Sequence, residues 1–207
     1  MLRLVTGSST LAPYGRESFI YLNHMELLLA TGNQHKARAI ELILDRPIKI
    51  ISLDLPEIQS IHVSEVIEEK AKVAFDLIGQ PVLVEDTSLS VHAWNNLPGA
   101  LIKWFLESVG NDGICQMLQS YEKLEATAET CIGYFNGQQF ISFSGLMEGY
   151  ISRQPKGENG FGWDPIFIPD GWDKTIAEMS NAEKEGFVSM RSRATLKLKT
   201  FLDKGKL

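Results

Sequence analysis

The hydrophobic positions in the first half of the chain change their spacing several times, which predicts alternating strands and helices. Apolar residues run together within 26–30 and 81–86, as is typical of strands buried on both faces. Over 34–44 they recur at the spacing of one helix face, and Pro47 follows that stretch and ends it. We therefore expect strands over 26–30, 48–53 and 81–86, and helices over 34–44 and 64–78.

Short strand patterns dominate the second half of the chain. The Asn136-Gly137 dipeptide is its strongest hairpin signal. The patterns predict strands over 89–93, 126–135, 139–144 and 145–153, helices over 98–109, 112–120, 180–185 and 188–203, and a structured loop with a strand over 161–170. Alternating strands and helices followed by a meander of strands predict an α/β protein with a mixed sheet. The strand-rich middle is expected to form its own lobe, with a cleft beside the first half.

The length of 207 residues fits one domain, or one domain with a small appended lobe. Residues 1–24 stand apart because their periodicity is weak and they lack the sustained apolar stretch of a secretory signal. Two interpretations stay open for them, an extension that is flexible or loosely docked and a misassigned start codon. The expected domain covers residues 25–207.

Charge and cysteine content exclude several classes of protein. The net charge of -6 gives no basic excess to neutralise a nucleic-acid backbone. No apolar run reaches the roughly 20 residues that a membrane span needs. Cys115 and Cys131 have neither zinc spacing nor a disulfide framework, so they are expected to be small buried hydrophobes of a reduced, cytoplasmic protein.

The segment Thr31 to Lys36 lies at a predicted strand-to-helix junction. Such junctions bind phosphates, because free backbone N–H groups and the helix dipole favour an anion. Gly32 would let the backbone approach a ligand closely, and Lys36 would add a positive charge. The alternative is a capped helix start with a solvated lysine.

Adjacent carboxylates, Glu85 and Asp86, follow the buried strand. Successive strand residues face opposite sides, so only one of the two is expected to point into a given site, as a metal ligand or general base. The alternative is a strand-end turn. Glu57 is a candidate second metal ligand, and Lys70 on the following helix resembles any solvated lysine by spacing alone.

The stretch Gly160-Phe161-Gly162-Trp163-Asp164-Pro165 is the most unusual in the chain. An aromatic face and a rigid polar group are what a purine needs for stacking and for recognition of its edge. The alternative is a tight aromatic turn that closes the core. Near the C-terminus, Arg191 is a candidate to hold a base carbonyl or a phosphate, and Ser189 is a sensible helix N-cap.

Together these pieces resemble the inosine triphosphate pyrophosphatase family over about residues 26–202. Four blocks in order carry the resemblance: Thr31-Gly32-Asn33 with Lys36, residues 82–87, residues 161–165, and Ala182-Glu183-Lys184 followed by Ser189 and Arg191. The segments 97–99 and 102–106 are similar to the eukaryotic-type branch.

The resemblance implies an elongated mixed β-sheet flanked by helices, with two lobes, a nucleotide site in the cleft between them and a homodimer. It also implies hydrolysis of ITP, dITP or XTP to the nucleoside monophosphate and pyrophosphate, with Mg²⁺, or Mn²⁺ in its place. Asp86 would be catalytic, and Glu57 and Asp86 would hold the metal. The implied substrate-binding residues are Thr31, Gly32, Asn33, Lys36, Lys70, Thr87, Phe161, Gly162, Trp163, Asp164, Lys184, Ser189, Met190 and Arg191.

The chain departs from the family pattern at three places. Ala39 stands where the family commonly has a glutamate, Met190 stands where a histidine is usual, and the segment 184–189 is one residue longer, with Gly186-Phe187 inside it. Ala39 and Met190 favour one alternative to an active purine pyrophosphatase, a degenerate nucleotide-binding protein with little turnover. A second alternative is a related pyrophosphatase for modified pyrimidine nucleotides.

Overall fold

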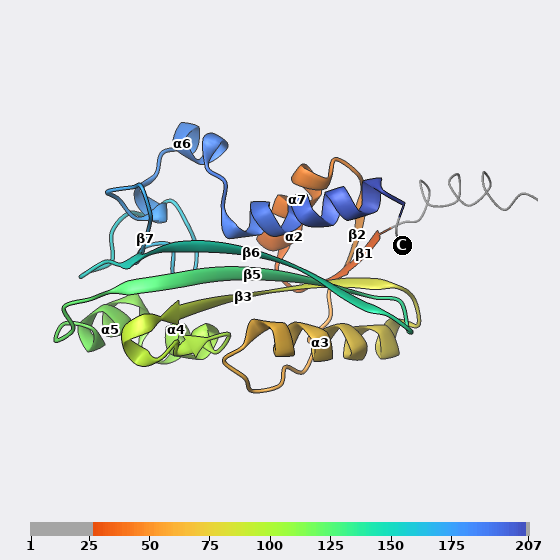
Figure 1. Ribbon diagram of the computed structural model, residues 1–207, viewed down its shortest axis with the longest axis horizontal. Helices are drawn as coiled ribbons and strands as arrows, with labels where there is room; N and C mark the ends of the chain where they lie inside the picture. The colour runs from red at the N-terminus through yellow and green to blue at the C-terminus, as the bar shows by residue number, and fades with distance from the viewer. Residues whose placement is uncertain (1–26, 206–207) are drawn as a thin grey trace, which may run out of the picture.

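The computed structural model describes residues 27–205, which form an elongated molecule built on one long β-sheet (Figure 1). The predicted extension over 1–24 and the first residues of the predicted domain lie outside the described residues. The sheet has seven strands in the order β2-β1-β3-β5-β6-β7, with β4 paired beside β3. Within residues 27–205, no helix is long and apolar enough to cross a membrane.

The elements follow the predicted order. The strands are β1 (Leu27–Ala30), β2 (Ile48–Ile51), β3 (Val82–Val91), β4 (Pro98–Gly99), β5 (Glu125–Phe135), β6 (Phe140–Ile151) and β7 (Phe167–Pro169). The helices are α2 (Gln34–Leu44), α3 (Val63–Ile78), α4 (Ile102–Ser108), α5 (Gly110–Met117), α6 (Asn181–Gly186) and α7 (Met190–Asp203), with 3₁₀ turns at His92–Trp94 and Ile176–Glu178. β1 is parallel to β2 and β3, and the remaining pairs are antiparallel, so the predicted mixed sheet is confirmed.

Two long strands are continuous where the sequence analysis divided them, so that part of the prediction is wrong. β3 is one strand of 10 residues and β6 is one strand of 12 residues. The predicted boundary between the strands 139–144 and 145–153 falls at Gly145, and the structure has no break there. Gly145 stays in the ladder opposite Thr130, and its missing side chain makes room for α7.

The helix predicted over 98–109 begins only at Ile102. Pro98 and Gly99 instead form β4, which pairs with Ser90 and Leu89 of β3. Gly99 has a φ of 59°, and a Cβ there would lie 2.2 Å from the Ile61 carbonyl oxygen. This close approach requires glycine and prevents an earlier helix start.

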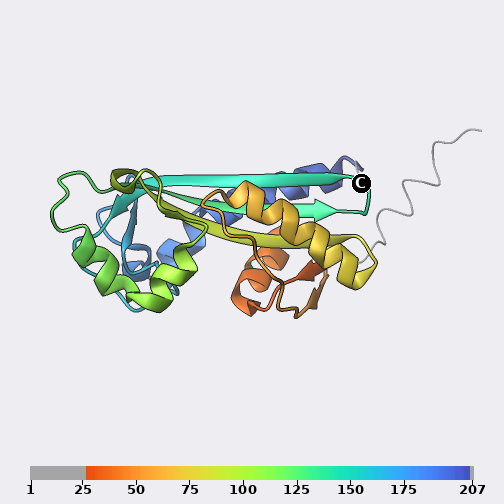
Figure 2. The ribbon, with the colours of Figure 1, turned by 90° about the horizontal axis from the view of Figure 1, so that it is seen from below.

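Helices cover both faces of the sheet at the end that carries β1 and β2 (Figure 2). Leu27 and Leu29 pack in one core with α2 and α7, whereas Leu28 and Ala30 pack in a second core with α3. Successive strand residues point to opposite faces, so two covered faces require an uninterrupted apolar strand. We call this end, with α2, α3, β1 and β2, the first lobe.

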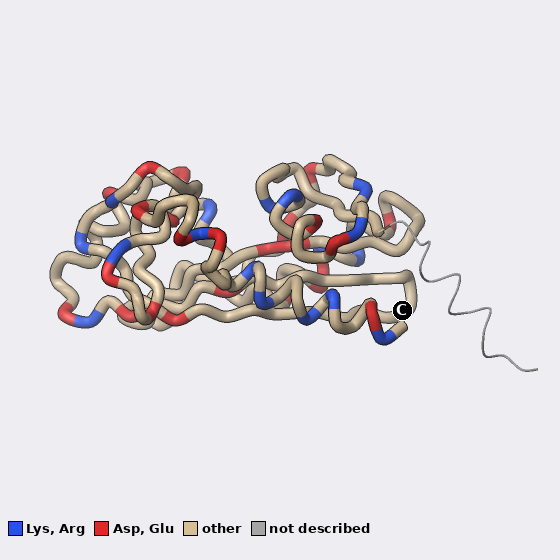
Figure 3. Tube along the Cα trace, turned by 90° about the horizontal axis from the view of Figure 1, so that it is seen from above, with Lys and Arg blue, Asp and Glu red and all other residues tan. Residues whose placement is uncertain are grey.

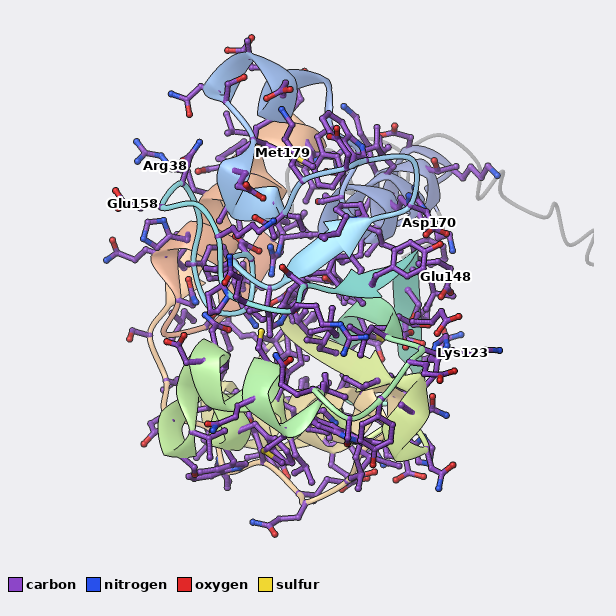
Figure 4. All side chains as sticks on the ribbon, turned by 90° about the vertical axis from the view of Figure 1, so that its left-hand side faces the viewer. Arg38, Lys123, Glu148, Glu158, Asp170 and Met179 are labelled. Carbon is purple, nitrogen blue, oxygen red and sulfur yellow. The ribbon has the colours of Figure 1, made fainter. Side chains whose placement is uncertain are left out.

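The other end of the sheet has a third core and forms the second lobe. α4 and α5 cover one face, and the segment with Met179 covers the other (Figure 4). Cys115 lies in this core and Cys131 in the core under α3, both buried and free. The prediction that they are small buried hydrophobes is confirmed.

α7 lies along the long strands β5 and β6 and brings its N-terminal residues to the boundary between the lobes (Figure 1). Several of its basic residues, among the blue segments of the helix in Figure 3, donate hydrogen bonds to neighbouring backbone carbonyls. Arg193 donates to Leu146, Lys197 to Ser144 and Lys199 to Ile43. These hydrogen bonds help to hold α7 in place on its neighbours.

Replacing Gly145 by alanine is expected to destabilise the fold and displace the start of α7. A Cβ at this position would lie 2.0 Å from the Met190 carbonyl oxygen and 2.6 Å from the Ala194 nitrogen. Backbone atoms cannot yield as a flexible side chain can, so a loss of about 1–3 kcal/mol in unfolding free energy is expected, measured by urea denaturation. Gly186→Ala is the control, because nothing lies within 4 Å of its Cβ position. Equal stability of the two variants would contradict the close approach.

Candidate functional site

A cavity of about 960 Å³ lies between the two lobes. It is lined by every residue that the sequence analysis assigned to the site. These are Thr31, Gly32, Asn33, Lys36, Glu57, Lys70, Asp86, Thr87, Phe161, Gly162, Trp163, Asp164, Lys184, Ser189, Met190 and Arg191. The four sequence blocks, far apart along the chain, therefore meet in one place.

The topology of the sheet leaves one edge of β3 open at this cavity. β1 pairs with β3 only as far as Val84, and β4 pairs with it again from Leu89. Residues 85–88 therefore have a strand neighbour on the β5 side only. Side chains of helices on either face can reach around this edge to the carboxylates.

The start of α2 is built by Asn33. Its side-chain Oδ1 accepts hydrogen bonds from the backbone nitrogens of His35 at 3.0 Å and Lys36 at 3.2 Å, while Thr31 Oγ1 accepts from the Asn33 nitrogen at 3.1 Å. The expectation of a turn with free N–H groups is thus only partly right, because three of them are used internally. Within the described chain, the Gly32 and Gln34 nitrogens make no such bond.

Glu85 is the most buried charge of the site, with a side chain that is 0% exposed. Its Oε2 lies 2.8 Å from Lys36 Nζ, and its Oε1 accepts a hydrogen bond of 3.1 Å from Arg191 Nε and one of 3.0 Å from Thr87 Oγ1. Burial alone raises the pKa of this carboxyl, but the charges of Lys36 and Arg191 and the hydrogen bonds outweigh it and hold the pKa at about 2. Glu85 is therefore a fixed anion between two cations.

Asp86 points to the opposite face of β3, toward α3. Lys70 Nζ lies 3.3 Å from Asp86 Oδ2 and 2.5 Å from Glu57 Oε1, and Asp86 Oδ1 accepts from the Thr87 nitrogen at 2.7 Å. Burial lowers the pKa of Lys70, but the two carboxylates more than compensate and raise it above its ordinary value. The ammonium group is charged at neutral pH.

Both carboxylates contribute to the same site, so the expectation that only one would is wrong. Lys36 Nζ lies 2.8 Å from Glu85 and also 3.7 Å from Asp86. The alternation of strand side chains is obeyed, because Glu85 faces α2 and α7 and Asp86 faces α3. The open edge of β3 lets one lysine reach both. Glu85 is the residue that sequence reasoning missed, although it directly follows a run of residues buried on both faces.

The turn over 160–164 presents Phe161 to the cavity. Asp164 Oδ2 accepts from the Phe161 nitrogen at 3.0 Å, and burial raises the pKa of this carboxyl. Phe161 is 46% exposed and its ring centroid lies 5.9 Å from the Arg191 guanidinium carbon. Trp163 is buried in the core of the second lobe, where it packs against Phe167. The turn closes the core, as the structural interpretation predicted, and it also exposes an aromatic face; purine stacking on that face stays a prediction.

The remaining predicted residues lie at the junction of α6 and α7. Ser189 is the N-cap of α7 and accepts from the Ser192 nitrogen at 3.1 Å, which confirms its structural role. Lys184 donates to the backbone oxygen of Asn159. Met190 is 5% exposed and packs in the core of the second lobe. The longer segment 184–189 still brings Lys184 and Arg191 to the same cavity.

Glu57 and Asp86 offer the oxygen ligands that a hard divalent cation prefers. Both carboxylates point at one ammonium group, so their oxygens already surround a single position that favours positive charge. Among residues 27–205, no group of three or more His, Cys, Asp or Glu residues is arranged to hold a metal. The residues fit a cation held by two carboxylates, with its other positions left for water or for the oxygens of a ligand.

Comparison with known proteins places this site in a family. A family model described as the Ham1 family matches residues 27–201. The inosine triphosphate pyrophosphatase of Schizosaccharomyces pombe is 44% identical over 184 residues, which cover 87% of this chain and 96% of that protein. The dITP/XTP pyrophosphatase of Methanopyrus kandleri is 38% identical over 164 residues, 77% of this chain and 87% of that protein.

A solved structure has the same fold. The structure of a HAM1 protein from Coxiella burnetii superposes with a TM-score of 0.76 at 28% sequence identity, and the match covers 87% of this chain and 99% of that one. The residues matched by the family model include the whole described site. The chain therefore belongs to the Ham1 family.

Proposed function

We propose that the chain hydrolyses inosine- and xanthosine-type purine nucleoside triphosphates, ITP, dITP and XTP, to the nucleoside monophosphate and pyrophosphate. The observation that carries the proposal is the arrangement of one cavity. Lys36 and Lys70 flank Asp86 at one end of it, and the exposed Phe161 ring lies beside Arg191 near its other lobe. Cations next to a carboxylate suit a polyphosphate, and the aromatic face suits a base.

These groups orient the substrate. The triphosphate lies at the start of α2, where Gly32 and Gln34 keep backbone donors and Lys36 and Lys70 supply charge. Asn33 Oδ1 is used by the helix cap, so a contact from that side chain would come from its amide nitrogen. The base lies on Phe161, close to Arg191, with Lys184 lining the same cavity.

The reaction takes place between these two ends. Water attacks the phosphorus nearest the sugar, the bond from that phosphorus to the bridging oxygen breaks, and pyrophosphate leaves with that oxygen. Asp86 accepts the proton of the attacking water, because it is the carboxylate that faces both lysines and is only partly buried. Glu85 does not take this role, since its oxygens are bound by Lys36, Thr87 and Arg191.

Glu57 and Asp86 would hold the Mg²⁺ ion, or Mn²⁺ in its place. A bound divalent ion neutralises charge that develops on the phosphoryl oxygens. Lys70, which now pairs with both carboxylates, would be available to bind phosphate oxygens through its long side chain.

The base that the site selects depends on which protein groups can donate a hydrogen bond to it. Hypoxanthine and xanthine carry a 6-oxo acceptor, whereas adenine carries a 6-amino donor that leaves donors of the protein unpaired. Met190 has a thioether and cannot donate a hydrogen bond. Discrimination therefore depends on Arg191 and Lys184. We further propose that the chain acts as a homodimer in the cytoplasm.

A panel of triphosphates tests the proposal. We expect Mg²⁺-dependent release of pyrophosphate, with kcat/KM for ITP, dITP and XTP about 10⁴-fold above that for ATP, since unpaired donors reject adenine. Pyrophosphate is quantified for each substrate with and without EDTA. Highest kcat/KM for a modified pyrimidine nucleotide would favour the pyrimidine alternative. Calorimetric binding of ITP with turnover at background would favour a degenerate nucleotide-binding protein.

A further inference from the structure

His35 stacks on Phe161 across the mouth of the cavity. The two ring centroids are 6.1 Å apart and the ring planes differ by 19°. This separation falls within the range of interacting aromatic pairs. His35 belongs to α2 of the first lobe and Phe161 to the loop before β7 in the second, so the ring pair joins the lobes.

Both rings are carried by backbone that is fixed locally. The His35 nitrogen donates to the N-cap Asn33, which sets where the imidazole leaves the helix. The Phe161 nitrogen donates to Asp164, and the next residue's carbonyl accepts a hydrogen bond of 2.9 Å from Asn111 Nδ2. The stacked arrangement therefore follows from two anchored turns.

The two rings have different relations to the cavity. Phe161 lines it, whereas His35 does not. His35 thus touches the aromatic ring from the rim and leaves the cavity open. It can influence a bound base only through Phe161.

The stack also completes a closed chain of contacts around the mouth. Lys36, the neighbour of His35, is paired with Glu85, and Glu85 is paired with Arg191. Arg191 in turn lies 5.9 Å from the Phe161 ring. The Phe161 ring therefore has two neighbours that hold it, His35 of α2 and Arg191 of α7.

We propose that His35 is a positioning residue for the base, which holds the Phe161 ring across the cavity mouth so that a purine can stack on it. This inference rests on the proposed function and deepens it, because it adds a residue from the phosphate-binding turn to base recognition. The end of the site that binds phosphate is thereby coupled to the end that binds the base. The coupling acts on binding and leaves the chemical step at Asp86 alone.

His35→Ala is expected to raise KM for ITP about two- to ten-fold, the range of one aromatic pair, while kcat changes by less than about two-fold. His35→Phe keeps a ring at the position and is expected to restore KM, which a merely structural loss would not do. His62→Ala is the matched control, because His62 is also an exposed histidine at a helix start, makes no side-chain capping bond and lies outside the cavity lining. It should leave both constants unchanged.

A double-mutant cycle with Phe161→Ala isolates the contact. If His35 acts through Phe161, adding His35→Ala to Phe161→Ala raises KM no further. Full additivity of the two changes, or an unchanged KM in His35→Ala, would overturn the proposal. Calorimetric Kd values for ITP in the parent, the two single variants and the double variant distinguish a failure of this proposal from a failure of the proposed function. Absent turnover in the parent would contradict the proposed function, whereas the coupling would still be read from binding.

Discussion

Asp86→Asn is expected to lower kcat for pyrophosphate release from ITP by about 10³-fold, the middle of the range for loss of a general base. The amide cannot accept the proton of the attacking water, and it is a poorer ligand for a divalent cation. The Asp86 carboxylate also faces Lys36 at 3.7 Å and Lys70 at 3.3 Å, so its charge helps to place both lysines. Steady-state rates across the ITP concentration range separate this loss of kcat from a change in KM.

The fold of this variant should be intact, because asparagine has nearly the same shape. Asp76→Asn is the control, since it makes the same chemical change on an exposed position of α3. It should retain parental kcat and KM. Undiminished turnover in Asp86→Asn would show that Asp86 is not needed for the chemical step and would contradict the proposed mechanism.

Glu85→Gln is expected to destabilise the fold and impair the site together. The change leaves Lys36 and Arg191 beside a buried group that carries no charge. Removing one partner of a buried ion pair costs about 3–5 kcal/mol of unfolding free energy, which in a protein of this size lowers Tm by about 10 °C. Because both cations lose their anchor, KM for ITP should rise as well.

The loss depends on pH in a definite direction. The pKa of Glu85 is about 2 in the folded chain against an ordinary value of 4.5, so the folded state favours the ionised form. Its contribution to stability is fully present above about pH 4.5 and is lost as the pH falls toward 2. The unfolding free energies of the parent and of Glu85→Gln should therefore converge over that interval.

Glu68→Gln provides the comparison, because Glu68 pairs with Lys72 at 3.0 Å on the exposed face of α3. An exposed pair of this kind contributes at most about 1 kcal/mol, so Tm should hardly change. Urea denaturation from pH 2 to 7 measures both variants. A Glu85→Gln chain as stable as Glu68→Gln at neutral pH would show that Glu85 does not anchor the two cations.

The order of the elements and the two-lobed α/β fold could be predicted from the sequence, because strong periodicity and clear end signals define most of them. The buried run Leu27–Ala30 and the capped helix after it are examples. The lengths of β3 and β6 could not. Whether the strand continues through Gly145 depends on α7, which is distant in sequence and packs against this glycine.

The site shows the same division between local and distant information. Residues with a chemical signature, such as Lys36, Asp86 and Phe161, were predicted and line one cavity. Glu85 was missed because side chains alternate between the two faces of a strand, so only one of Glu85 and Asp86 was expected to point into the site. Only the sheet topology reveals the open edge where Lys36 meets both carboxylates. The stack of His35 on Phe161 likewise depends on how the lobes face each other.

The continuity of β3 and β6 has a consequence for how the molecule holds together. The cores of the first lobe take Leu83 and Val84 from β3, and the core of the second lobe takes Leu89 and Val91 from the same strand. Because both lobes contain parts of the same long strands, neither lobe can unfold while the other stays native. The two lobes form one cooperative folding unit, so a weakened contact at the cleft lowers the unfolding free energy of the whole chain.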